Sequence, residues 1–336
     1  AEAHNSLGIL HQELQNYEEA VASYSKAIQI NPDFAVFHFN LGAVFQMLGD
    51  LDGALKQHRR ALQIQPDYVD ARYNLGLTLQ KLGRIDEAIS SYRDVLSIEP
   101  QHIKAVNNLG TAFYENGNLE EAEGWYRQAI TINPTYAEAH NNLGTTLEEC
   151  DRLEESVASY QQAIALLPEY AEAHYNLGNA YRKLDRLKEA ITSYNNAISL
   201  RANYGDAINN LGVAFMELGD LEKAVACFQE AISVNAKDAE AHWNLALGFL
   251  RQGDWKGGWE EFEWRLKRNK DKKRPFQWRT PPVEMWPGYS LRGKTIVVYA
   301  EQGVGDEIMF SSCIPDLLEQ SPKRVLLECD PRLEPL

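Results

Sequence analysis

Seven asparagines recur through the sequence at a constant spacing of 34 residues. A carboxamide carries both a donor and an acceptor, so it can pair with the backbone of an extended peptide whatever that peptide's side chains are. Asparagine is a mediocre helix former, and bonding to neighbouring backbone or helix ends is the alternative role. The pattern therefore predicts either a polypeptide-binding ladder or a structural one, made of Asn40, Asn74, Asn108, Asn142, Asn176, Asn210 and Asn244.

Large aromatic side chains stand one residue before some of these asparagines. Buried aromatic side chains are frequent anchors in protein interfaces, so Tyr73 and Tyr175 are predicted peptide-binding residues beside the ladder. Packing between adjacent helices is the alternative interpretation. The position holds, in order, Phe39, Tyr73, Asn107, Asn141, Tyr175, Asn209 and Trp243.

Histidines and cysteines do not form a recognisable metal site. Five histidines share one position of the 34-residue period, but no carboxylate or cysteine recurs beside them with ligand spacing. We therefore predict a packing role between helices for His4, His38, His140, His174 and His242. The four cysteines contain no CxxC pair, which argues against a zinc site or a disulfide framework. They predict reduced thiols in a cytoplasmic protein, with no bound metal.

A different candidate site lies near the end of the chain. Gly303 and Gly305 form a loop after the apolar run from Thr295 to Ala300, and Asp306 suits the N-cap of a following helix. A glycine-rich loop between a strand and a helix N-terminus can hold an anionic group. The sequence therefore predicts an anion or acceptor loop here, although two glycines without a third are weak evidence for a dinucleotide site.

The elements that position the ladder follow the same period. Glycines at 34-residue intervals are each preceded by leucine, and small and mostly aromatic residues follow 12 and 16 positions later. Each unit carries two apolar stripes at helical spacing, divided by a turn (Gly83, for example) and closed by a proline such as Pro100. One helix pair cannot bury its own apolar faces, so the units are expected to stack into a solenoid.

This pattern resembles the tetratricopeptide repeat family over residues 1–268, as eight repeats of which the last is degenerate. The resemblance implies an all-α solenoid, a right-handed superhelix of about eight helix-turn-helix repeats with a concave groove lined by first helices. Helical geometry places positions two, six, nine and thirteen of a unit on one stripe. The ladder, at position six, is similar to that of O-GlcNAc transferases, which holds polypeptide. We therefore expect its carboxamides to point into the groove, free of hydrogen bonds to neighbouring residues.

The composition changes after Leu250, where five of the seven tryptophans fall between residues 255 and 286. Basic residues and prolines predict a linker over 269–293. An apolar strand at 295–300, a helix, and a strand at 325–329 then predict a β-α-β unit over 294–336, the start of a Rossmann-like α/β domain. The expected fold is thus an all-α solenoid followed by a partial α/β unit.

The order of motifs in this last part resembles bacterial tetratricopeptide proteins fused to a heptosyltransferase-like (GT-B) glycosyltransferase domain. The resemblance implies that Asp306 is a candidate base or acceptor-positioning residue and that the full-length parent uses a nucleotide-sugar. The chain stops two strands into the first Rossmann half, so we expect a truncated domain, no activity of this chain alone and no cofactor of its own. Catalysis by the parent is left open.

Charge and hydropathy exclude two partner classes. Residues 1–250 hold 18 Lys and Arg against 34 Asp and Glu, whereas residues 251–336 hold 15 against 14. Nucleic-acid binding needs cations to neutralise phosphates, and no apolar stretch approaches the ~18 residues of a membrane span. The predicted function is protein or peptide binding, as the substrate-recruiting arm of a bacterial glycosyltransferase-like protein. The alternative is a non-enzymatic scaffold for complex assembly or self-association.

Overall fold

A computed structural model describes residues 1–267, 292, 295–299, 318–319 and 322–328. Contacts divide the chain into two units, Ala1–Phe262 and Glu263–Leu336. Each unit is described by itself below. The predicted solenoid boundary at residue 268 lies outside the described residues.

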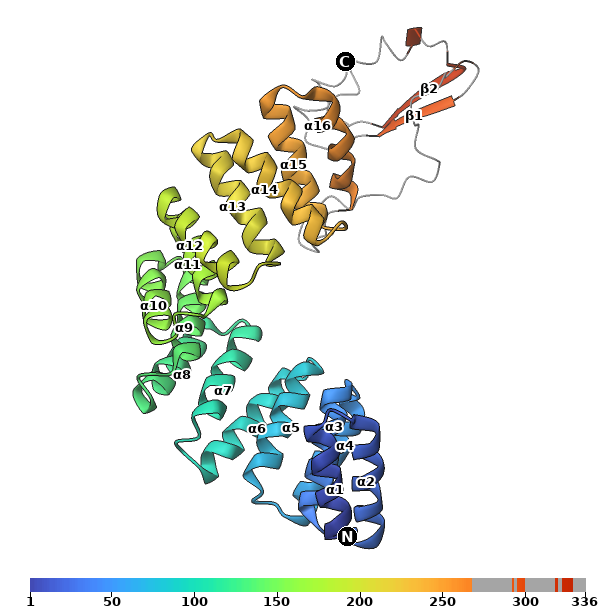
Figure 1. Ribbon diagram of the computed structural model, residues 1–336, viewed down its shortest axis with the longest axis vertical. Helices are drawn as coiled ribbons and strands as arrows, with labels where there is room; N and C mark the ends of the chain where they lie inside the picture. The colour runs from blue at the N-terminus through green and yellow to red at the C-terminus, as the bar shows by residue number, and fades with distance from the viewer. Residues whose placement is uncertain (268–291, 293–294, 300–317, 320–321, 329–336) are drawn as a thin grey trace. The chain divides into compact units, whose positions relative to one another are not determined.

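The first unit contains α1 to α16 and follows the 34-residue period, with a first and a second helix in each repeat (Figure 1). The first helices are α1 (Glu2–Glu13), α3 (Ala35–Leu48), α5 (Val69–Lys81), α7 (Ile103–Glu115), α9 (Ala137–Glu149), α11 (Ala171–Lys183), α13 (Gly205–Leu218) and α15 (Ala239–Gln252). The second helices are α2 (Tyr17–Ile30), α4 (Leu51–Ile64), α6 (Ile85–Ile98), α8 (Leu119–Ile132), α10 (Leu153–Leu166), α12 (Leu187–Leu200), α14 (Leu221–Val234) and α16 (Trp255–Phe262). The predicted helical repeats are confirmed.

Within a repeat, the glycine at position eight lets the two helices meet. In repeat 6 a Cβ at Gly178 would stand only 2.6 Å from the ring of Tyr194, which is itself fully buried. Real side chains do not approach this closely, so only hydrogen fits beneath the aromatic ring. The same contact joins Gly144 to Tyr160. The glycine and aromatic positions of the period are therefore two halves of one packing contact.

The turn inside each repeat is fixed by position fifteen, where the backbone is left-handed. Five repeats place glycine there, with Gly83 at φ 72° as an example. Gln15, Asp151 and Asp185 adopt the same conformation at φ 58–60° without glycine's freedom. This conformation is a common way to end a helix. The turn therefore ends the first helix in every repeat, although three repeats lack the glycine signal.

Stacked repeats share a continuous apolar core. One cluster of buried side chains runs from Leu55 on α4 through Tyr92 and Leu109 to Leu147 on α9. Its members come from both helices of successive repeats, so each repeat covers apolar surface that its neighbour cannot bury alone. The solenoid predicted from the period is confirmed for the first unit.

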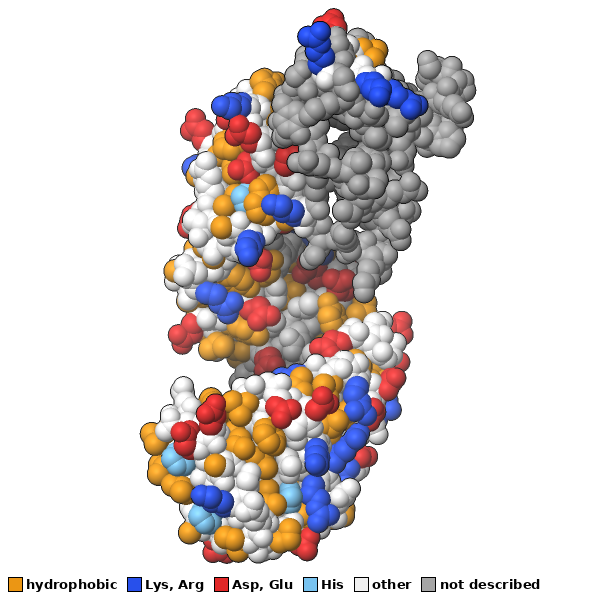
Figure 2. Space-filling model, turned by 90° about the vertical axis from the view of Figure 1, so that its right-hand side faces the viewer, with side chains coloured by type: hydrophobic (Ala, Val, Ile, Leu, Met, Phe, Trp, Pro, Cys, Tyr) orange, Lys and Arg blue, Asp and Glu red, His pale blue; other side chains and the backbone are white. Residues whose placement is uncertain are grey.

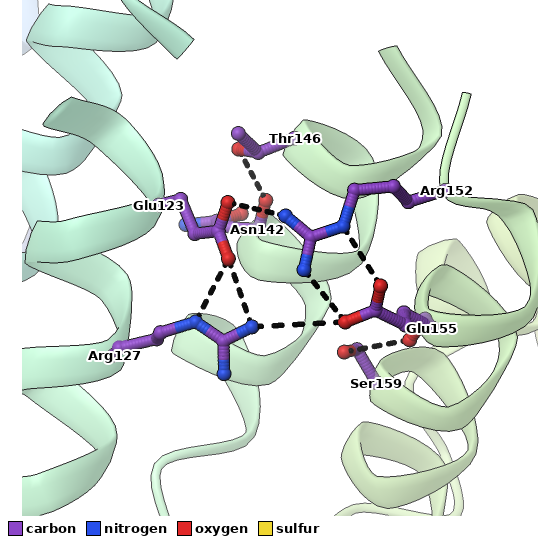
Figure 3. Close-up of polar contacts among 7 residues, drawn as sticks. All are labelled: Glu123, Arg127, Asn142, Thr146, Arg152, Glu155 and Ser159. Carbon is purple, nitrogen blue, oxygen red and sulfur yellow. Dashed lines mark hydrogen bonds and ion pairs between the residues drawn. The ribbon is translucent and has the colours of Figure 1, made fainter. Parts of the chain in front are cut away.

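Ion pairs link the second helices of repeats 4 and 5 (Figure 3). Arg152 contacts Glu123 on α8 at 2.7 Å and Glu155 on α10 at 2.6 Å, and Arg127 lies 2.8 Å from Glu123 and 3.9 Å from Glu155. The arginine hydrogen bonds hold the pKa of Glu155 below its usual range. The four charges close a ring across the junction, at a site that is largely open to solvent.

The second unit contains two parallel strands, β1 (Thr295–Tyr299) and β2 (Arg324–Glu328), paired from Thr295↔Arg324 to Tyr299↔Glu328. A 3-10 helix spans Glu263–Leu266. The predicted strands over 295–300 and 325–329 are thus found within one residue. The predicted intervening helix falls mainly on residues outside the described part, so the Rossmann-like architecture stays a prediction.

Candidate protein-binding face

The first helices present one continuous stripe to solvent, which we call the first-helix face. It consists of positions two, six, nine and thirteen of each repeat. In repeat 5, for example, these are Glu138, Asn142, Thr145 and Glu149. Positions two and thirteen are exposed in most repeats, and positions six and nine are mostly half-buried. The predicted stripe is therefore accessible, with the asparagines along its middle.

The asparagines of this face are hydrogen-bonded across repeat junctions. Six of the seven donate from Nδ2 to the side chain at position five of the preceding repeat, 35 residues earlier. The acceptor is an asparagine Oδ1 in four junctions and a tyrosine Oη in two. The bonds are Asn40 to Asn5 (2.9 Å), Asn108 to Tyr73 (2.9 Å), Asn142 to Asn107 (3.3 Å), Asn176 to Asn141 (3.1 Å), Asn210 to Tyr175 (3.2 Å) and Asn244 to Asn209 (3.0 Å).

The exception shows what controls the ladder. Position five before Asn74 is Phe39, which has no acceptor, and Asn74 donates instead to the carbonyl of Asp70 at 2.9 Å. The expectation that the carboxamides are free of hydrogen bonds is therefore wrong for the Nδ2 groups. In six of the seven asparagines the preceding repeat supplies the acceptor. Among the described residues, nothing donates to the Oδ1 atoms of Asn142 and Asn176. These amides are held in place while their acceptors stay available.

Tyr73 and Tyr175 pack between adjacent helices, as their alternative interpretation predicted. The Tyr73 ring lies 6.0 Å from that of Tyr92 and 5.1 Å from that of His102, between centroids. Tyr175 repeats the arrangement with Tyr194 and Tyr204 at 6.1 and 5.1 Å. Burial is the main cause that raises the pKa of both hydroxyls. A role in contacting peptide stays a prediction.

The period histidines hold the loops between repeats. Nε2 of His38, His140 and His174 lies 2.9, 3.1 and 3.0 Å from the carbonyl oxygen of the proline six residues earlier. A neutral imidazole can donate this bond through the Nε2 hydrogen. These three histidines therefore hold the inter-repeat turn, whereas the predicted packing role between helices stays a prediction. No group of three or more metal-ligating side chains occurs in the part of the chain that the structure describes.

Family comparison assigns the first unit. Matches to TPR repeat and tetratricopeptide repeat families run without interruption from residue 13 to residue 253. The chain belongs to the tetratricopeptide repeat family. The TPR repeat matches cover residues 13–49, 47–83, 149–185, 178–219 and 212–253, and the tetratricopeptide repeat matches cover residues 73–137 and 125–158. Repeats of this family form protein-interaction scaffolds.

Individual relatives match only parts of this tetratricopeptide repeat protein. Protein FlbA of Caulobacter vibrioides is 40% identical over 81 residues, which are 24% of this chain and 13% of FlbA. A chain in the crystal structure of the APC/C hetero-tetramer Cut9-Hcn1 superposes with a TM-score of 0.59 at 18% identity, covering 69% of this chain and 48% of that one. A crystal structure of MamA gives a TM-score of 0.45 at 27% identity, over 51% and 94%. The Cut9-Hcn1 likeness supports the fold alone.

A second set of contacts, which the sequence did not predict, orients side chains on the first-helix face of this tetratricopeptide protein. The aromatic position of the second helix, where it is tyrosine, sends its hydroxyl to positions nine or twelve of the first helix. Tyr194 donates to Asn179 at 2.8 Å, and Tyr160 contacts Thr145 at 3.2 Å and Glu148 at 2.9 Å. The signal available in the sequence was the difference between tyrosine and phenylalanine, since Phe228 faces a repeat with Val213 and Met216 there.

Repeat 2 departs from this arrangement because His58 replaces the aromatic residue. The imidazole is fully buried, and neither ring nitrogen has a hydrogen-bond partner among the residues that the structure describes. Burial lowers the pKa of His58 to about 4, so the ring is neutral at pH 7. The side chain packs against Gly42, and the cost of burying its two ring nitrogens is not offset by hydrogen bonds to the described residues.

The other predicted site residues, Gly303, Gly305 and Asp306, lie outside the described residues. Their roles in an anion or acceptor loop stay predictions. Among the helices that the structure does describe, none has both the length and the apolar character needed to cross a membrane.

Proposed function

We propose that this chain binds an extended polypeptide along the first-helix face. The observation that carries the proposal is the fixed orientation of the ladder amides. At Asn142 and Asn176 the bonded Nδ2 keeps a second N–H, and the Oδ1 is also free of bonds from the described residues. Asn210 differs, because its Nδ2 donates to both Tyr175 and Asn179. An amide that is already ordered loses less entropy when it pairs with a peptide backbone, so the inter-repeat bonds favour binding.

Repetition along the stack supports a sequence-tolerant ligand. A backbone amide or carbonyl recurs regularly in any extended polypeptide, and the ladder repeats one polar group on successive first helices. The half-buried position of Asn142, Asn176 and Asn210 limits competition from water without closing the site. The proposed ligand is therefore recognised first through its main chain.

The test compares two pairs of substitutions that break the same two inter-repeat hydrogen bonds. Asn142→Ala with Asn176→Ala removes the ladder carboxamides, whereas Asn107→Ala with Asn141→Ala removes their acceptors and leaves the carboxamides. Binding of labelled unstructured peptides is followed by fluorescence anisotropy, and helicity by circular dichroism. We expect the first pair to weaken binding about tenfold or more, as loss of two interface hydrogen bonds would do. The second pair should weaken it much less.

An equal loss of binding in both pairs, in parallel with a loss of helicity, would show that the ladder serves only the stack. Retention of full affinity by the first pair would remove the amide contact from the proposal. The two results are distinguishable because both pairs lose the same two ladder bonds. Asn107→Ala also removes its bond to Glu138, so the second pair disturbs the stack at least as much as the first.

The finer proposal is that the chain is the substrate-recruiting arm of a bacterial, cytoplasmic glycosyltransferase-like protein. The parallel pairing of β1 and β2 supports it, because parallel neighbours need a crossover of a dozen or more residues, as α/β domains have. Gly303, Gly305 and Asp306 fall within that crossover. Turnover of nucleotide-sugars by the full-length gene product tests the proposal. A folded but inert full-length product would favour the alternative, a scaffold that assembles partners or self-associates.

A further inference from the structure

The first-helix face differs in charge from one edge to the other. At positions twelve and thirteen, opposite charges are paired: Lys183 lies 2.9 Å from Glu148, and Arg182 lies 3.0 Å from Glu217. At position two, repeats 5 to 7 carry Glu138, Glu172 and Asp206, all exposed. No lysine or arginine of the described residues lies within 4.0 Å of these three carboxylates. Basic side chains thus pair with acids along the first edge, whereas none of the described basic residues pairs with these three carboxylates of the second edge.

Tyrosines accompany these three carboxylates. Glu138 accepts hydrogen bonds from Tyr136 Oη at 2.9 Å and from Asn107 Nδ2 at 3.1 Å, which hold its charge in place without neutralising it. Tyr136, Tyr170 and Tyr204 precede α9, α11 and α13, each two residues before the acidic side chain. We call Tyr136, Glu138, Tyr170, Glu172, Tyr204 and Asp206 the tyrosine-acid strip. The strip is bounded on one side by Lys104, which occupies position two of repeat 4.

The electrostatics of the tyrosines indicate that the strip is continuous. After burial, the largest cause that raises the pKa of Tyr170 is the charge of Glu172, followed by that of Glu138 on the preceding first helix. Burial likewise raises the pKa of Tyr204 to about 12, and Glu172 of the preceding first helix adds to this shift. The hydroxyls of Tyr170 and Tyr204 are therefore each influenced by carboxylates of two repeats. The strip presents a negative potential along three successive first helices.

One tyrosine of the strip already contacts a cation of the chain itself. The guanidinium carbon of Arg201 lies 4.6 Å from the centroid of the Tyr204 ring, within the range of a cation–π contact. A tyrosine face beside a carboxylate offers a lysine or arginine both an aromatic surface and an ion pair. The excess of acidic side chains does not extend over the whole solenoid. Lysine and arginine side chains form a row over the N-terminal repeats (Figure 2), where α4 carries Lys56, Arg59 and Arg60.

We propose that the tyrosine-acid strip binds lysine and arginine side chains of a basic, extended polypeptide whose main chain runs along the asparagine ladder. The inference rests on the proposed function and adds the chemical class of the ligand. Charge complementarity is its main support. First-turn acids also favour helix formation through the helix dipole, and the experiment is designed to separate these two roles.

Two triple variants of the full chain make the same change in net charge. Glu138→Gln with Glu172→Gln and Asp206→Asn neutralises the strip. The control, Glu120→Gln with Glu121→Gln and Glu154→Gln, neutralises exposed first-turn acids of α8 and α10. Binding is measured by fluorescence anisotropy with labelled unstructured peptides that alternate glycine and serine with lysine, with glutamate or with glutamine.

We expect the lysine peptide to bind tighter than the other two. The strip variant should weaken its binding about tenfold, the sum of three solvent-accessible ion pairs, and should reduce its dependence on salt concentration. The control variant should change its affinity less than about twofold. Tyr170→Leu, which keeps an apolar side chain but removes the aromatic face, should weaken the lysine peptide severalfold and leave the glutamine peptide unchanged.

Four results would overturn the inference. Equal weakening by both triple variants would show that net charge, and not the strip, attracts the peptide. If the lysine peptide binds no tighter than the other two, the ligand is not a basic polypeptide. If the glutamine peptide binds and depends on Asn142 and Asn176, while the strip variant has no effect, the strip fails and the proposed function stands. If none of the three peptides binds, the two fail together.

Discussion

Repeats 2 and 6 have the same backbone and different polar contacts. In repeat 6, Tyr194 bonds Asn179, and Asn179 accepts a second bond from Asn210 of the next repeat at 2.9 Å. In repeat 2, His58 occupies the tyrosine position, and its ring nitrogens have no hydrogen-bond partner in the described part of the chain. Both repeats bury the ring equally beneath a glycine. Packing is therefore common to the repeats, whereas the hydrogen bonds that orient the first-helix face belong to individual ones.

This difference separates the two demands on a repeat. Stacking requires small residues beside large ones at fixed positions, because the helices must approach closely. Orienting the face requires a hydroxyl or amide of the right length, and one substitution removes it. The following predictions test that separation, beginning with the packing contact that both repeats share.

The glycine beneath the ring should carry the largest effect. Gly178→Val forces a branched side chain against the Tyr194 ring, since even a Cβ there would stand 2.6 Å from the ring. We expect a loss of about 3 kcal/mol in the free energy of unfolding, measured by chemical denaturation. Gly124→Ala is the control, because nothing lies within 4 Å of a Cβ there and α8 should gain up to ~1 kcal/mol. Similar losses in both variants would contradict the packing interpretation.

Protonation of His58 should have the next largest effect. Its pKa is about 4 in the folded protein, against about 6.5 in an unfolded chain. The unfolded state therefore binds the proton more tightly, and stability is full above pH 6.5 and lost as the pH falls towards 4. We expect this residue to account for about 2–3 kcal/mol of the loss between pH 7 and pH 4. Denaturation of the wild type and of His58→Phe at both pH values checks it, and identical pH dependence would disprove it.

Exchanging the hydroxyl between repeats should have a smaller effect, with the sign set by the first helix. Tyr194→Phe removes one of the two hydrogen bonds to Asn179, leaving the bond from Asn210, and should cost about 1 kcal/mol. Phe228→Tyr adds a hydroxyl opposite Val213 and Met216 and should also destabilise, by about 1–2 kcal/mol. Thermal denaturation of both variants measures these changes. A stabilised Phe228→Tyr would mean that the hydroxyl finds another partner and that the face residues do not determine its effect.

The ion-pair ring between repeats 4 and 5 should have the smallest effect. Arg152→Ala removes contacts to Glu123 and Glu155, but the ring is solvent-accessible. We expect only a slight loss in the free energy of unfolding at low salt, and a smaller one at high salt. Chemical denaturation at two ionic strengths measures it. A large, salt-independent loss would show that Arg152 contributes through packing rather than charge.

Much of the fold was predictable from the sequence. Gly178 and Tyr194 each recur with the period, and a repeated pair of small and large residues specifies a close helix contact. The turns were harder to predict. Gly83 indicates a left-handed backbone by its residue type, but Asp151 and Asp185 adopt the same conformation without that signal. The strands β1 and β2 were predicted from apolar runs. Their parallel pairing depends on residues distant in the chain.

The candidate site was predicted in position but not in bonding. Period and helical geometry placed Asn142 on an accessible stripe. They did not show that Asn107, which lies 35 residues earlier, accepts its hydrogen bond, or that Phe39 leaves Asn74 to bond its own helix. Such partners are separated by a whole repeat in the sequence, so local sequence patterns do not predict how close they lie in space.

The sequence by itself determined that the chain forms stacked helix pairs and where the ladder asparagines stand, because periodic packing depends on residue size and spacing. Only the tertiary structure decided how many hydrogen-bonding groups those asparagines retain and which acidic side chains have no cation beside them. Both depend on contacts between repeats, which arise when the helices stack and bring distant side chains within bonding distance.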